Sequence, residues 1–226
     1  MDELLRQLPR FDAPTGHAIK PSRAAARVRA AAVEAFSELG FHGTTTREIA
    51  ARLELSTAAI YPHYSSKQSL LYDIVLEAHA AAYASLTALP LAGSLTARER
   101  LEAATAALSM WHARNSMLAR VANFEMRALS AEQLEHIHAL RRRTSAFFRA
   151  IIEEGGVRGE FRSDGASAIT QLITSMCVDV CRWYPSKTHN DVDALGAFYA
   201  DAAVRIVIND DPGGRISALP APGDRD

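Results

Sequence analysis

Hydroxyl-bearing residues stand at two places in the N-terminal third of the chain where each can hold the free end of a short helix. The runs are Thr44-Thr45-Thr46-Arg47-Glu48-Ile49-Ala50 and Ser56-Thr57-Ala58-Ala59-Ile60-Tyr61-Pro62-His63-Tyr64. Serine and threonine hydroxyls accept hydrogen bonds from the unpaired N–H groups of a first helical turn, so these runs predict two short helices around a turn at residues 54–56. Such helices are too small to enclose a substrate, but the second fits the major groove of DNA.

The segment from about Arg23 to Leu76 resembles the helix-turn-helix domain of TetR-type transcriptional regulators. A long first helix ends in Glu38-Leu39-Gly40-Phe41, the threonine-rich run follows, and Ile-Tyr-Pro-His-Tyr then precedes Lys67 and Leu70-Leu71, all in the family's order and spacing. The resemblance implies an all-α regulator with an N-terminal DNA-binding domain, a C-terminal ligand-binding and dimerisation bundle, and double-stranded operator DNA as its partner.

The predicted DNA contacts come from these two runs and the next helix start. The resemblance places Tyr61 and Lys67 at phosphate oxygens, and the open helix N-terminus at Thr46 offers another donor. Short side chains at the start of the recognition helix let the backbone approach base edges, while Arg47 and His63 supply more hydrogen-bond readout. Ordinary solvated surface is the alternative. The predicted contact residues are Thr45, Thr46, Arg47, Thr57, Ala58, Ala59, Tyr61, His63 and Lys67.

Composition is typical of an intracellular protein of two units. The 226 residues carry a net charge of -1, but residues 20–67 hold seven basic and four acidic residues, so the predicted DNA-binding end is modestly basic. Two cysteines provide no disulfide framework, no apolar run is long enough for a membrane span, and no secretion signal opens the chain. We therefore expect a cytoplasmic protein without membrane association.

The pattern of apolar residues predicts helices throughout. A flexible arm at 1–20 precedes a DNA-binding domain at 21–80, a helical bundle at 81–209 and a disordered tail at 210–226. The first helix is expected to end at Gly40, and Gly155-Gly156 is expected to stop a later one. The expected helices cover about 22–39, 67–86, 97–115, 117–128, 131–154, 165–184 and 192–209. The last two are apolar on several sides, and the resemblance implies that they pair with their twins in a homodimer.

Polar residues beside aromatic ones in the second domain suggest a mostly apolar pocket for a small-molecule effector. The predicted ligand-binding residues are Trp111, Asn115, Phe124, Arg127, Phe148, Met176, Asp179, Arg182 and Trp183. The edge of a core or of an interface is the alternative for each of them. His136 and His138 lie on different helix faces, and Cys177 and Cys181 are best explained as buried apolar residues, so no metal and no cofactor are predicted.

Four further segments resemble the branch of TetR regulators that respond to acyl-CoA thioesters of fatty-acid or steroid breakdown. They are Phe124–Ser130, Arg141–Phe148, Gly156–Phe161 and Cys181–Pro185. The resemblance implies a repressor that releases a palindromic operator when an acyl-CoA binds. Two alternatives remain: a constitutive or activating regulator whose bundle only dimerises, and an enzyme with a structural helix-turn-helix. No catalytic constellation supports the enzyme, so it is the weaker alternative.

Overall fold

The computed structural model describes residues 22–90, 95–162, 164–185 and 190–208, and all regular structure within them is helical. The elements are α2 (Arg23–Gly43), α3 (Thr46–Arg52), the 3₁₀ turn η1 (Thr57–Ala59), α4 (Lys67–Thr87), α5 (Ala97–Arg114), α6 (Ser116–Phe124), the 3₁₀ turn η2 (Met126–Ala128), α7 (Ala131–Val157), α8 (Ala166–Trp183) and α9 (Val192–Val207). The all-α prediction is confirmed. The predicted arm at 1–20 and the predicted tail at 210–226 lie outside the described residues.

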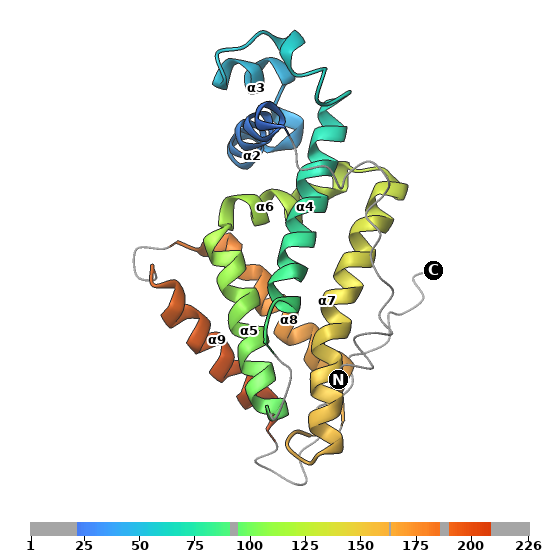
Figure 1. Ribbon diagram of the computed structural model, residues 1–226, viewed down its shortest axis with the longest axis vertical. Helices are drawn as coiled ribbons and strands as arrows, with labels where there is room; N and C mark the ends of the chain where they lie inside the picture. The colour runs from blue at the N-terminus through green and yellow to red at the C-terminus, as the bar shows by residue number, and fades with distance from the viewer. Residues whose placement is uncertain (1–21, 91–94, 163, 186–189, 209–226) are drawn as a thin grey trace, which may run out of the picture.

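The molecule is elongated, with α2 and α3 at one end and the bundle of α5 to α9 below them (Figure 1). Helix α4 starts in the upper unit and continues into the bundle, where it packs against α5, α6 and α7. None of the helices that the structure describes is long and apolar enough to cross a membrane.

Local sequence signals set the helix ends of the upper unit. Gly40 adopts a φ of 72° and interrupts the helical geometry of α2 where the sequence predicts its end, although one further turn reaches Gly43. The Thr45 hydroxyl accepts from the Glu48 N–H, and the Glu48 carboxylate accepts from the Thr45 N–H at 2.6 Å, which forms a capping box at the start of α3.

One predicted helix cap and one predicted helix end were wrong. The recognition segment is a single 3₁₀ turn followed by further turns, and the Ser56 side chain makes no capping bond. Pro62 accounts for the short helix, because it has no N–H to donate and disfavours helical geometry at Tyr61. Helix α7 continues through Gly155-Gly156 to Val157. Gly155 does not end the helix; it leaves room for the Phe161 ring, since a Cβ at this position would lie 2.1 Å from Cδ2 of Phe161.

Two large apolar cores lie along the long axis. The first joins α2, α3 and the upper half of α4 to Val121, Met126, Ile137 and Leu140 of the bundle. The second fills the bundle between α5, α7 and α8, and Trp111 packs against both cores. Because the first core crosses from the upper unit into α6 and α7, a displacement of those helices also acts on the packing of the upper unit.

Candidate DNA-binding surface and ligand cavity

The predicted DNA-contact residues lie at the exposed end of the upper unit. Thr45, Arg47, Ala58, Tyr61 and His63 are exposed, and the remaining members of the set, Thr46, Thr57, Ala59 and Lys67, are half-buried. Tyr61 leaves 55% of its surface free although it is a large aromatic residue. Its hydroxyl makes no hydrogen bond to the residues that the structure describes, and in that position it is available to a phosphate oxygen.

Residues beside the contact surface fix the recognition turn on α4. Ile60 is buried, and the Tyr64 hydroxyl donates to Oδ2 of Asp73 at 3.2 Å. Arg29 forms ion pairs with Asp73 and with Glu77, so α2 joins the same polar cluster. Burial and the Asp73 charge raise the pKa of Tyr64, which therefore stays protonated and keeps donating at neutral pH.

Lys67 is held inside the upper unit by its own hydrogen bonds. Its Nζ donates to the carbonyl oxygens of Phe41 and Thr44, each at 2.6 Å, and lies 4.3 Å from the centre of the Phe41 ring. These two carbonyls lie between the break at Gly40 and the start of α3. In this geometry Lys67 ties α4 to the corner between α2 and α3, and its ammonium does not extend freely toward a phosphate.

A second set of contacts joins the same corner to the bundle. Oε2 of Glu125, directly after α6, accepts from the backbone N–H of Phe41 at 3.1 Å. The side chain of Gln68 donates to the carbonyl oxygen of Ala128 at 2.8 Å. Gly40 breaks the helical geometry directly before Phe41, and at this break a carboxylate from the bundle accepts from the Phe41 N–H. The corner of the DNA-binding unit is thus attached directly to α6 and η2.

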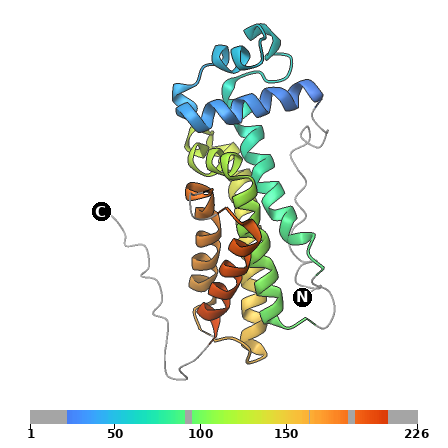
Figure 2. The same cartoon turned by 90° about the vertical axis from the view of Figure 1, so that its left-hand side faces the viewer.

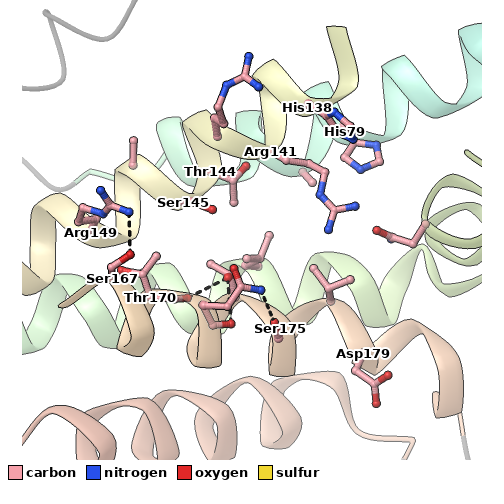
Figure 3. A pocket seen from close by; sticks show the side chains of 18 of the residues that line it. His79, His138, Arg141, Thr144, Ser145, Arg149, Ser167, Thr170, Ser175 and Asp179 are labelled. Carbon is pink, nitrogen blue, oxygen red and sulfur yellow. Dashed lines mark hydrogen bonds between the residues drawn. The ribbon is translucent and has the colours of Figure 1, made fainter. Parts of the chain in front are cut away.

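The bundle contains a cavity of about 1100 Å³ between α7 and α8, with further walls from α4, α5 and α6 (Figure 3). Two of the predicted ligand-binding residues, Phe124 and Asp179, line it. Small side chains leave the space open between the two helices, since α7 presents Ser145 and Ala146 and α8 presents Ala168 and Ser175.

The other seven predicted ligand-binding residues do not line this cavity, and each has a structural environment of its own. Large apolar side chains account for most of them, because they pack in cores rather than around an open space. Phe148 is fully buried in the second core, and Trp111 and Met176 pack against that core. Trp183 packs on a small cluster around Tyr184, and Asn115 donates to the Trp111 carbonyl oxygen. Arg127 is exposed, and Arg182 forms an ion pair with Asp179 at 3.0 Å.

The cavity contains arginines that sequence reasoning did not assign. Arg141, Arg142 and Arg149 all project from α7, and Figure 3 shows Arg141 and Arg149 toward opposite ends of the site. Arg142 pairs with Glu135 at 2.6 Å, whereas neither Arg141 nor Arg149 forms an ion pair with any described residue. Arg141 and Arg149 are eight positions apart on α7, which corresponds to about 12 Å along the helix axis. The sequence does contain a signal for a basic site, since Arg149 follows the run Arg141-Arg142-Arg143 about two helical turns later. The wall therefore offers two unneutralised cations to an anion.

Two neutral histidines form the inner end of the cavity. Nδ1 of His79 bonds the Val75 carbonyl oxygen at 2.9 Å, and Nδ1 of His112 bonds the Leu108 carbonyl oxygen at 2.8 Å. A carbonyl oxygen only accepts, so Nδ1 carries the proton in both rings. Burial lowers the pKa of each to about 4, and both histidines are uncharged at neutral pH.

The buried His112 predicts a loss of stability in weak acid. The unfolded chain takes up this proton near pH 6.5, but the folded protein does so only near pH 4, so stability falls as the pH drops through that window. We expect His112 to contribute a loss of about 2 kcal/mol in the free energy of unfolding between pH 7 and pH 5, and His79, whose pKa burial lowers equally, to contribute as much again. Urea unfolding measures it. His112→Phe should remove the His112 share, about half of this loss, and an unchanged slope in that variant would contradict the assignment.

The other titratable residues considered in the sequence have ordinary structural positions. Cys177 and Cys181 are buried, and burial raises the pKa of both thiols. His136 accepts or donates one hydrogen bond at 2.6 Å with the Tyr72 hydroxyl, which joins α7 to α4. No group of three metal-binding side chains occurs in the part of the chain that the structure describes.

An exposed helix-turn-helix end, joined through one long helix to a helical bundle, is the architecture of a DNA-binding regulator. Residues 28–74 match the family described as bacterial regulatory proteins, tetR family, and residues 94–207 match the tetracyclin repressor-like C-terminal domain. The chain belongs to the TetR family of transcriptional regulators. Its relatives in this family are regulators rather than enzymes.

Solved structures agree with this assignment. A tetR-family regulatory protein from Rhodococcus RHA1 is 44% identical, with 83% of this chain and 98% of that chain covered and a TM-score of 0.78. PfmR from Thermus thermophilus is 28% identical over 79% of this chain and 97% of its own, with a TM-score of 0.72. FadR from Bacillus subtilis, solved with stearoyl-CoA, shares the fold at 22% identity, covers 79% and 97% of the two chains and has a TM-score of 0.64. A search of curated proteins found no match.

Proposed function

We propose that this protein is a homodimeric repressor that leaves a palindromic operator when an anionic small molecule occupies the bundle cavity. Arg141 and Arg149 carry the proposal, because two unneutralised cations in one concave site are suited to phosphate or carboxylate groups. Acyl-CoA thioesters are the candidate effectors. They combine several phosphates with a long arm, and the FadR structure with stearoyl-CoA supports the same class.

The proposed dimer uses α8 and α9, which lie beside each other on one face of the bundle (Figure 2). Leu172 of α8 and Phe198 of α9 are exposed there, with 51% and 71% of their surfaces free. Large apolar residues on neighbouring helices favour burial against a second copy. A symmetric dimer would present two recognition turns to half-sites about 34 Å apart or a multiple of that.

The proposed signal passes from the cavity to the DNA-binding unit through the end of α6. Phe124 lines the cavity, and its neighbour Glu125 holds the Phe41 N–H at the corner before α3. An effector that displaces Phe124 would also displace this carboxylate, and α4 would move with it. To change the population from mostly bound to mostly free, the effector must prefer the DNA-incompetent form by roughly 5.5 kcal/mol.

The proposal is tested by titrating stearoyl-CoA, CoA and stearate against the protein on an operator selected from random DNA. Stearoyl-CoA should release the operator, and the double variant Arg141→Ala, Arg149→Ala should need at least tenfold more of it, since two charge-assisted contacts are lost. Release is followed by fluorescence anisotropy of the labelled DNA. Arg98→Ala, an exposed arginine paired with Glu102 on α5, serves as the control and should respond like the wild type.

Glu125→Ala tests the signal route in the same titration. This variant should bind stearoyl-CoA with unchanged affinity by calorimetry but release the operator less completely. If no thioester releases DNA, the acyl-CoA assignment fails and the constitutive regulator becomes the better description. If the double arginine variant responds normally, the effector does not use this cavity.

A further inference from the structure

The inner cavity wall is made of hydrogen-bond acceptors. Because Nδ1 of His79 and Nδ1 of His112 are both occupied by carbonyl oxygens of their own helices, the remaining ring nitrogen of each, Nε2, is an acceptor on the side away from its helix. The two rings come from α4 and α5, and both line the cavity. His112 leaves only 4% of its surface exposed, and Nδ1 makes its one hydrogen bond to the described residues.

Two threonines on α8 add further acceptors to the cavity. The Thr170 hydroxyl donates to the Ala166 carbonyl oxygen, and the Thr174 hydroxyl donates to the Thr170 carbonyl oxygen, each at 2.8 Å. Each hydroxyl has one proton and already donates it, so toward the cavity the oxygens have only lone pairs to offer. The charged donors of the site belong to the arginines of α7, and Ser145 and Ser175 add neutral hydroxyl groups; Figure 3 shows Arg141 beside His79.

An unsubstituted acyl chain does not match this wall. It would exclude water from the acceptors of His79 and His112 without giving them a donor, and an unpaired buried acceptor lowers affinity by about tenfold to a hundredfold. A hydroxyl or amide N–H in the same place would pair with them. The cations of α7 meanwhile require a negative group on the same molecule.

We propose that the effector is an anion that donates hydrogen bonds from hydroxyl or amide groups on its body to His79 and His112. This inference rests on the proposed function, because it takes the cavity to be the effector site. Two sources offer the required donors: hydroxyl groups on a carboxylic acid, and the amide groups of the pantetheine arm in a CoA thioester.

Two pairs of probes separate these sources on the full-length protein. Octadecanoate and 12-hydroxyoctadecanoate differ by one hydroxyl, and adenosine 3′,5′-bisphosphate and CoA differ by the pantetheine arm with its amides. Calorimetry gives the affinities. At least one donor-bearing probe should bind tenfold tighter or more than its partner, and the pair that shows the preference identifies the source.

Variants at the two histidines decide whether these acceptors are the cause. His79→Leu and His112→Phe should abolish the preference, while His79→Gln, which keeps an acceptor, should retain it; circular dichroism checks that each variant is folded. Equal affinities within both pairs, no binding by either donor-bearing probe, or a preference that survives both apolar variants would overturn the inference. Operator release by octadecanoate without any preference would leave the proposed function intact and refute this inference alone. A preference for the donor-bearing probes without operator release would support the hydrogen bonds to the histidines and refute the proposed function.

Discussion

Replacing Phe198 with Glu is expected to convert the protein into a monomer and to lower operator affinity by at least a hundredfold. Phe198 exposes 71% of its surface on α9, while the other side of this helix packs on α5, where Gly196 lets the backbone approach Met110. A carboxylate in the centre of an apolar contact would lose its hydration without a partner. A monomer reads one half-site, so the affinity gained by joining two recognition turns is lost.

Light scattering measures the assembly, and anisotropy on an operator measures the affinity. Val157→Glu is the control, because Val157 is 90% exposed at the end of α7, a helix outside the proposed interface, and also exchanges an apolar side chain for a carboxylate. This control should keep both the mass and the affinity of the wild type. If Phe198→Glu gives a folded monomer with wild-type affinity, or leaves the dimer intact, the proposed interface is wrong.

The helices of the upper unit were predictable because local chemistry decides where they begin and end. Thr45 and Glu48 form a capping box from residues three apart, and Gly40 takes a φ that other residues avoid. The length of the recognition segment was harder to predict. Ser56 is a good capping residue by type, but Pro62 removes the bonds that would have extended the helix after it.

The ligand-binding residues were less predictable, since an aromatic residue among polar ones looks the same in a sequence whether it lines a core or a cavity. Phe148 lies in the second apolar core and Trp111 packs against it, as is usual for large apolar side chains. The cavity exists because small residues face each other across α7 and α8, and this depends on how two distant helices are placed. Tertiary packing, rather than local pattern, therefore decides which residues line the cavity.

Lys67 shows the same limit for a charged residue. At the start of α4 beside a predicted DNA surface, a lysine is a reasonable phosphate contact by type and position. Only the folded chain brings the carbonyl oxygens of Phe41 and Thr44 within 2.6 Å of its Nζ. Those residues lie more than twenty positions earlier, and no local pattern reports that distance.

Replacing Lys67 with Met is therefore expected to destabilise the DNA-binding unit rather than to remove one phosphate contact. Met keeps most of the aliphatic stem, but the Phe41 and Thr44 carbonyls lose a charged donor, and Thr44 is 1% exposed. Two hydrogen bonds to a charged group correspond to about 3 kcal/mol in the free energy of unfolding. Operator affinity should fall with the loss of structure at the start of α3. The salt dependence of binding should keep its slope, because the ammonium was already engaged within the protein.

Arg47→Ala is the matched comparison, since Arg47 is exposed at the start of α3 and makes no ion pair with the described residues. It should leave urea unfolding unchanged and reduce the slope of log affinity against log salt by about one unit, as expected for one lost phosphate contact. Both variants are measured by urea unfolding and by operator binding over a salt range of about 50 to 200 mM. If Lys67→Met unfolds like the wild type and lowers the slope by about one, Lys67 is a phosphate contact after all. Its ammonium must then turn from the two carbonyls to the DNA when the operator binds.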